Sequence, residues 1–253
     1  MTVHDEIMKT AQQVADDYHR AFDSDLISVM LYGSAVTAEY DPKKSDLNFL
    51  IVLSEEGIEE LHLAHSLAAK WRKKRVGTPL FLTKAYIESS LDTFPIEFLN
   101  MKRNYKLISG ENLLEKITFK KDFIRMQCER ELKGKLLLLR ERYVETGGKA
   151  KDLRELISAS IHTFIFVFRG LLYLLEKEVP ATKRGTVIML AKELNLDEEL
   201  FLALLQIGAG TLKRSQPETD DIFKRYMKQI RSLALLMDSE DFRWSAESTG
   251  VQE

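Results

Sequence analysis

The fold is decided by the stretch Leu31-Tyr32-Gly33-Ser34 and, after a polar loop, Ser45-Asp46-Leu47-Asn48-Phe49-Leu50-Ile51-Val52-Leu53. The apolar run 27–32 stops at the Gly-Ser turn, and a loop containing Asp41-Pro42 leads into the second apolar run. This pattern predicts a strand, a turn, a loop and a second strand. Because side chains alternate along a strand, we expect Asp46 and Asn48 on one face, available for chemistry, and Leu47 and Phe49 on the core face.

The polar residues of this stretch are suited to binding phosphate. Gly33 lets the backbone turn tightly, and Ser34 adds a hydroxyl beside backbone N–H groups, so we place both, with Ser45, among the substrate-binding residues. Asp46 and Asn48 offer two oxygen ligands at positions i and i+2, which suits a hard cation such as Mg²⁺ bridging those phosphates. We therefore treat Asp46 and Asn48 as the candidate metal ligands and catalytic residues.

Gly33-Ser34, a ten-residue gap and Ser45-Asp46-Leu47-Asn48 at the head of an apolar strand resemble the signature of the nucleotidyltransferase superfamily. That superfamily includes DNA polymerase beta and the aminoglycoside nucleotidyltransferases. The resemblance implies that Gly33 and Ser34 hold a nucleoside triphosphate and that Asp46 is the first ligand of a pair of magnesium ions. Asn48 occupies the place of the second acid, and its amide oxygen brings no negative charge.

The resemblance also implies a third carboxylate on a later strand, and here the sequence departs from the family. The next strand candidate, 78–83, contains no Asp or Glu. The nearest acids are Glu88, Asp92 and Glu97, for which surface or capping roles are the alternative. The metal site is therefore degenerate relative to the family, and enzymatic activity is left open.

Composition is that of an ordinary globular protein. The chain has 253 residues, 45% of them hydrophobic and 30% charged, with a formal net charge of −2, which gives no global attraction to nucleic acid. The lone Cys128 excludes an intrachain disulfide and indicates a reducing, cytoplasmic location. No signal peptide is visible, and the most apolar stretch, 161–175, is short for a bilayer, so we expect a buried bundle helix and no membrane partner.

The order of predicted elements gives an α+β fold: a small mixed nucleotidyltransferase-like sheet with helices, followed by an all-helical bundle. We expect an α/β domain at 1–115, a bundle domain at 116–245 and a disordered tail at 246–253. Single helices are predicted at 4–22 and from Ser54 to Trp71, and the chain from 105 to 110 reads as the last strand. In the long helix 119–143 we expect the buried face to consist of Phe123, Met126, Leu132, Leu136 and Leu139.

A basic helix end, 70–75, has five cations in six residues. One interpretation is an RNA-binding patch with Trp71 available for base stacking. The other is a solvated helix C-terminus whose cations complement the helix dipole while Trp71 covers the sheet, which we favour because such helix ends are common.

Three functional interpretations stay open. The first is a nucleotidyltransferase-like protein that binds a nucleoside triphosphate with Mg²⁺ and transfers a nucleotidyl group to a hydroxyl acceptor. The second is a catalytically degenerate protein that binds a nucleotide or RNA without turnover. The third is an interaction subunit, including a homo-oligomer, that uses an apolar surface of its bundle for assembly.

Overall fold

The structure is a computed structural model that describes residues 2–43 and 45–239. The chain divides into two compact units, the first ending at Phe119 and the second beginning at Lys120. We describe each unit by itself. The predicted domain boundary at 115/116 falls a few residues earlier in the chain, and the predicted tail, 246–253, lies outside the described residues.

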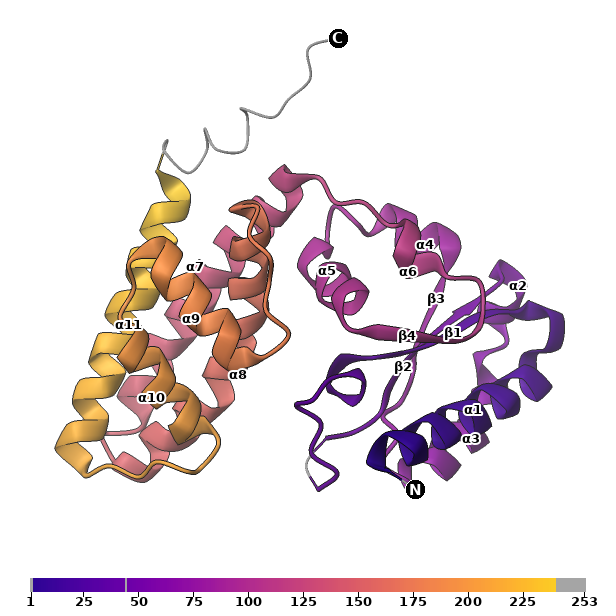
Figure 1. Ribbon diagram of the computed structural model, residues 1–253, viewed down its shortest axis with the longest axis horizontal. Coiled ribbons are helices and arrows are strands. Elements are labelled where there is room, and N and C mark those ends of the chain that lie inside the picture. Colours follow the sequence, from indigo (N-terminus) through magenta and orange to yellow (C-terminus); the bar gives the residue numbers. More distant parts are fainter. Residues whose placement is uncertain (1, 44, 240–253) are drawn as a thin grey trace, which may run out of the picture. The chain divides into compact units, whose positions relative to one another are not determined.

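The first unit contains a mixed sheet with the strand order β3-β2-β1-β4 (Figure 1). Its strands are β1 (Leu26–Tyr32), β2 (Asn48–Leu53), β3 (Leu80–Thr83) and β4 (Tyr105–Gly110). β1 pairs antiparallel with both β2 and β4, whereas β2 and β3 are parallel. A parallel pair needs a crossover connection, which the helical segment between β2 and β3 supplies.

Helices cover both faces of this sheet (Figure 1). The helices of the unit are α1 (Val3–Phe22), α2 (Glu55–Glu59), α3 (His65–Arg72), α4 (Lys84–Ser89), α5 (Pro95–Arg103) and α6 (Leu113–Lys116), with short 3-10 segments η1 (Asp23–Asp25), η2 (Gly33–Val36) and η3 (Leu61–Ala64). One core cluster joins α1 and Trp71 of α3 to the sheet, and the other joins residues of α4, α5 and α6 to its opposite face. The predicted α+β class is confirmed.

Strand β2 differs from the prediction that one of its faces carries polar chemistry. Phe49 and Ile51 lie in the core on the α1 side, while Leu50 and Val52 lie in the core on the α4 side. The strand begins at Asn48, so Asp46 precedes it. The reason is that helices cover both faces of the central strand, which leaves only its first residue partly exposed.

The segment after Ser54 was predicted as a single helix and is in fact three pieces, α2, η3 and α3. The Ser54 hydroxyl accepts a hydrogen bond from the Gly57 backbone N–H at 2.9 Å, so the predicted cap is present. The first piece ends at Glu59, so the helix continues through Gly57 although glycine is a poor helix former. The buried position of Gly57 beside Asp25 and Leu53 leaves no room for a larger side chain.

The second unit is a helical bundle. Its described helices are α7 (Lys121–Glu145), α8 (Ala150–Leu174), α9 (Lys183–Leu194), α10 (Glu198–Gly208) and α11 (Gln216–Asp238). α8 packs against α7, α9, α10 and α11 and is therefore the central helix, as its apolar composition predicts. On α7, Leu132, Leu136 and Leu139 are buried as expected, but Met126 is 59% exposed, because Ile124 and Cys128 supply the buried face instead.

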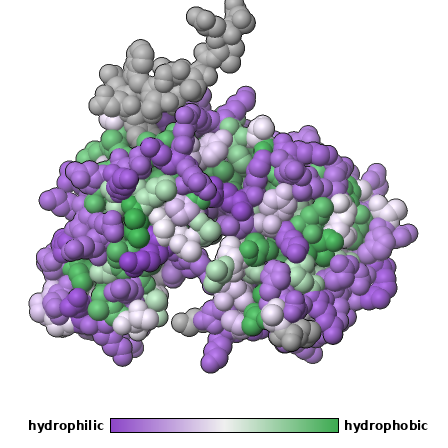
Figure 2. Space-filling view, viewed as in Figure 1, coloured by the Kyte–Doolittle hydropathy of each residue, from purple (hydrophilic) through white to green (hydrophobic). Residues whose placement is uncertain are grey.

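Helix α8 is the one described helix whose length and composition would suit a membrane span, with a mean hydropathy of 1.5 over its most apolar window. Twelve of its residues are nonetheless buried inside the bundle, which is typical of a core helix. On the face shown in Figure 2, hydrophilic residues cover most of the surface and hydrophobic residues form small scattered groups. The cytoplasmic location and the use of an apolar bundle surface for assembly stay predictions.

Candidate functional site

The Gly-Ser turn follows β1 directly, as the sequence predicts. Gly33 has a φ of +86°, a conformation that glycine adopts without steric cost. Its N–H donates to the Asn104 carbonyl at 2.8 Å, and the Ser34 carbonyl accepts from the Thr37 N–H at 3.0 Å. The partly exposed Ser34 hydroxyl hydrogen-bonds to no described residue. The turn therefore presents a hydroxyl and the start of a 3-10 segment at one end of the sheet.

Asn48 lies beside this turn, between two glycines. It pairs with Tyr32 in the sheet, so its backbone is fixed next to Gly33. A Cβ atom placed on Gly33 would lie 3.6 Å from Asn48 Nδ2, and one placed on Gly77 would lie 3.1 Å from Asn48 Oδ1. The two glycines thus leave the amide room on both sides, and Asn48 lies between the Gly33-Ser34 turn and the segment before β3.

Asp46 lies two residues before Asn48, and its exposed carboxylate faces a cation of this chain. Arg75 Nε lies 3.5 Å from Asp46 Oδ1, and Arg75 Nη1 donates to the carbonyls of Pro42 and Lys43 at 3.1 and 2.5 Å. The backbone links the same segments, because Leu47 N–H donates to the Arg75 carbonyl at 2.9 Å. Arg75 therefore connects the loop before Asp46 to the end of the basic segment.

Ser45 closes that loop. Its N–H donates to the Asp41 carbonyl at 2.7 Å, and its hydroxyl accepts from the Asp41 N–H at 3.2 Å. These two bonds hold the turn that delivers Asp46 to the sheet. The assignment of Ser45 as a substrate-binding residue stays a prediction, since its described hydrogen bonds are those of a loop residue.

A third carboxylate does not join this set among the described residues. The parallel register pairs Leu50 with Leu80, an isolated bridge pairs Leu47 with Val76, and the segment 76–79 between these pairs contains no acid. Glu88 belongs to α4, which starts at the opposite end of β3. No group of three or more His, Cys, Asp or Glu side chains able to hold a metal occurs within 2–43 and 45–239.

These donors decide which metal arrangement fits. Mg²⁺ is often held by one or two carboxylates together with substrate phosphates, so Asp46 and the Asn48 oxygen suit one such ion. Two adjacent divalent ions do not fit, because Asp46 is the single carboxylate in the set and already faces Arg75. When bound, one Mg²⁺ would supply charge neutralisation for the phosphates.

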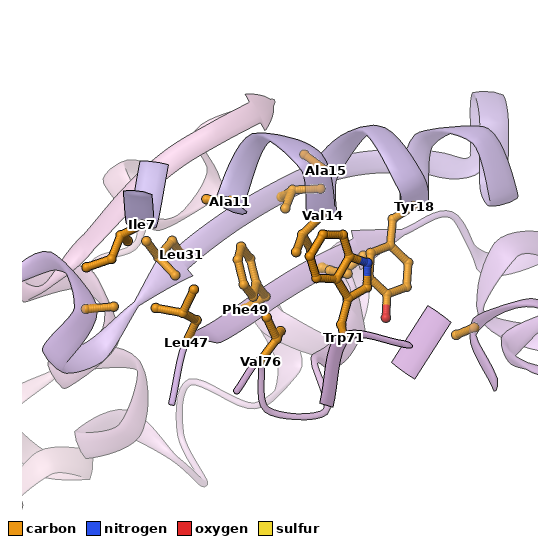
Figure 3. Close-up of a cluster of buried hydrophobic side chains, with 14 of the residues drawn as sticks. Ile7, Ala11, Val14, Ala15, Tyr18, Leu31, Leu47, Phe49, Trp71 and Val76 are labelled. Atoms are coloured by element: carbon orange, nitrogen blue, oxygen red, sulfur yellow. The ribbon is translucent and has the colours of Figure 1, made fainter. Parts of the chain in front are cut away.

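The basic helix end is mainly structural where it meets α1. Trp71 is 2% exposed and lies among the side chains of α1 and the sheet (Figure 3). Its indole Nε1 donates to Asp17 Oδ2 at 3.0 Å, and Lys70 and Arg20 pair with the same carboxylate. Burial opposes ionisation of Asp17, but the hydrogen bonds from Lys70 and Arg20 outweigh it and hold the pKa of Asp17 below its ordinary value. Trp71 is thus not available for base stacking, and the RNA interpretation loses its main support.

Sequence reasoning missed the part that Arg75 plays at the site. The sequence placed it among six residues of a basic helix end, whereas α3 ends at Arg72 and Arg75, with a φ of +60°, lies in the turn that follows. Asn104 and Gly77 were missed as well, because each meets the site through a contact between distant segments. No local signal marks any of the three.

Comparison with known proteins supports the fold. No protein-family model matches the sequence, and no curated protein matches it. Among solved structures, the chain is similar to spectinomycin adenyltransferase AAD(9) from Enterococcus faecialis, determined with ATP and spectinomycin. The TM-score is 0.52 at 16% identity, and the match covers 90% of this chain and 99% of the other. The chain therefore has a nucleotidyltransferase-like fold.

Proposed function

We propose that this chain is a nucleotidyltransferase-like protein that binds a nucleoside triphosphate at the Gly33–Val36 turn. The observation that carries the proposal is that Asn48 lies beside Gly33 of the Gly33-Ser34 turn, with Asp46 two residues before it in the chain. The solved neighbour with this fold was determined with ATP, which supports a nucleotide as the ligand.

Each residue has a defined part in this proposal. The Ser34 hydroxyl and the turn it belongs to contact phosphate oxygens, and Gly33 allows the ligand to approach the backbone. The Asn48 amide contacts the phosphate chain or its cation. Asp46 is the carboxylate ligand of one Mg²⁺ shared with the phosphates.

Nucleotidyl transfer to a hydroxyl acceptor is the second candidate function. The observation that favours it is that the likeness to an adenyltransferase extends over both units of the chain. In that reaction an acceptor oxygen forms a bond to the α-phosphorus, the bond to the β-phosphate oxygen breaks, pyrophosphate leaves, and the hydroxyl proton passes to a base or to water. Asp46 and Asn48 would position the phosphates for this displacement.

The binding proposal is tested by thermal unfolding with ATP, GTP, CTP and UTP, each with and without Mg²⁺. A ligand at about 100 times its dissociation constant stabilises the native state by about 2.7 kcal/mol, which is visible as a melting shift. We expect one or more nucleotides to shift the wild type, and Asp46→Asn to lose the magnesium-dependent part of the shift. Glu88→Gln, which removes an acid at the other end of β3, is the matched control. No shift with any nucleotide rejects the proposal.

Transfer is tested separately by pyrophosphate release from the nucleotide that binds, with candidate hydroxyl acceptors supplied. We expect Asn48→Asp, which restores the second acid of the family pattern, to raise turnover in magnesium. Nucleotide binding without turnover in wild type and Asn48→Asp alike would reject transfer and leave the binding function.

A further inference from the structure

We infer that Arg75 is a phosphate-binding residue, and that it lets this site hold a polyphosphate chain without a divalent cation. The inference rests on the proposed nucleotide site. In a site with three carboxylates, metal ions supply the positive charge that faces the phosphates. Here the side chain of Arg75 would supply it.

The guanidinium of Arg75 is held in place by some of its N–H donors, while others remain available for a ligand. Nη1 donates to two carbonyls of the preceding loop and Nε faces Asp46. Nη2, with two N–H groups, hydrogen-bonds to no described residue, and 44% of the side chain is exposed. A guanidinium fixed on one edge with donors left on the other is suited to a phosphate, because its planar fork matches phosphate oxygens.

Arg75 is also close enough in the fold to reach a ligand at the turn. It lies two residues before Gly77, and Asp46 lies two residues before Asn48, in segments joined by the Leu47–Val76 bridge. Two extended residues cover about 7 Å. A triphosphate that starts at the Gly33 turn beside Asn48 spans a length of this order, so its outer phosphates come within reach of Arg75.

The charges at the site agree with this assignment. A second carboxylate at position 48 would repel a polyphosphate unless a metal lay between them, whereas Asn48 adds no charge and its Nδ2 can donate. Asp46 and Arg75 together are neutral, and the side chain of Lys43 in the adjoining loop is exposed. The site therefore has no net negative charge that a divalent ion must neutralise before a polyphosphate can bind.

The test is isothermal titration with inorganic tripolyphosphate and with the nucleoside triphosphates, in EDTA and in Mg²⁺. We expect wild-type affinities in the two conditions to agree within roughly tenfold. Arg75→Gln should weaken tripolyphosphate binding in EDTA by roughly ten- to a hundredfold, since hydrogen bonds to charged groups have this strength. Arg72→Gln, an equal charge change at an exposed neighbour, is the control and should bind as wild type does.

Arg75→Lys separates a charge contact from support of the loop. It keeps the positive charge but loses the fork that spans Pro42 and Lys43, so we expect it to recover part of the tripolyphosphate affinity that Arg75→Gln loses. Equal losses in Arg75→Lys and Arg75→Gln, accompanied by equal falls in the unfolding free energy in urea, would assign the residue a loop role and overturn the inference. Nucleotide binding in Mg²⁺ but not in EDTA would overturn it while leaving the nucleotide site, and no binding in either condition would reject both.

Discussion

Gly33 and Gly110 both have positive φ, +86° and +83°, but differ in the space around them. A Cβ on Gly33 would have Asn48 Nδ2 at 3.6 Å as its nearest neighbour, whereas one on Gly110 would lie 2.1 Å from the Ile27 carbonyl oxygen. Gly33→Ala therefore incurs the left-handed backbone strain alone, about 1–2 kcal/mol. Gly110→Ala adds a clash that must separate β4 from β1.

We expect urea denaturation to show a clearly larger loss of unfolding free energy for Gly110→Ala than for Gly33→Ala. The measurement is matched because both glycines lie in the first unit and both changes add a single methyl group. Similar losses in the two variants would mean that backbone conformation, and not the close approach of β1 and β4, sets the requirement at position 110.

Both side chains of the Asp46–Arg75 pair are exposed, with 56% of the Asp46 side chain and 44% of the Arg75 side chain accessible. Exposed pairs at such distances contribute about 0–1 kcal/mol. We therefore expect Asp46→Asn to unfold within about 1 kcal/mol of wild type in urea. A larger loss would mean that the binding experiments with this variant report stability and not ligand contacts.

At the scale of elements, Asp17 attaches α1 to α3. Its pKa is lowered in the folded state from an ordinary value of 3.8, because the hydrogen bonds from Lys70 and Arg20 outweigh burial. A carboxyl with a lowered folded-state pKa stabilises the fold above its unfolded pKa, and this contribution is lost as the pH falls through the folded-state value. The first unit should thus lose stability as the pH falls below about 4.

We expect Asp17→Asn to be less stable than wild type at neutral pH and to lose less stability on acidification. Urea denaturation from pH 6 to about pH 2.5, followed by circular dichroism, measures the difference in slope. Glu111, whose pKa is held at about 2 by Lys116 and Lys84, contributes in the same direction and remains in both proteins. Parallel pH profiles would contradict the role given to Asp17.

Helix α8 allows a matched test of the bundle core. Phe168 is 1% exposed and its ring meets that of Phe201 edge-on at 5.4 Å, whereas Phe166, two residues away, is 49% exposed. We expect Phe168→Ala to lower the unfolding free energy by about 3–5 kcal/mol, as for buried aromatic residues elsewhere. Phe166→Ala should cost far less. Equal effects in thermal and urea unfolding would contradict the central position of α8.

At the scale of the whole molecule, the boundary between the units can be tested with fragments. Ile117 is 7% exposed and packs with Phe119 in the core on the α4 side, and Lys102 Nζ donates to the Ile117 carbonyl at 2.6 Å. A fragment 1–119 should therefore be more stable than 1–115, by about 3 kcal/mol from the apolar burial of these two side chains. Circular dichroism during urea unfolding checks this, and equal stabilities would favour the earlier boundary.

Local patterns in the sequence were sufficient to locate several elements of the fold. Apolar runs between turn signals located β1, β2 and β4. The apolar spacing of 119–143 located α7 within a few residues, and the apolar stretch 161–175 marked the C-terminal part of α8. Gly33-Ser34 could be placed at the end of a strand because an apolar run followed directly by glycine and a short polar residue is a local signal for a strand and a turn. That this turn binds phosphate stays a prediction from these signals and from the family resemblance.

Contacts between segments distant in the chain could not be predicted from local patterns and are seen first in the folded structure. Asn48 comes between Gly33 and Gly77, and Arg75 meets Asp46 across 29 residues. The two-sided burial of β2 likewise depends on helices that lie before and after it in the sequence. Such contacts are set by the packing of whole elements against one another. The residues next to a carboxylate in the sequence therefore do not indicate which distant cation will face it.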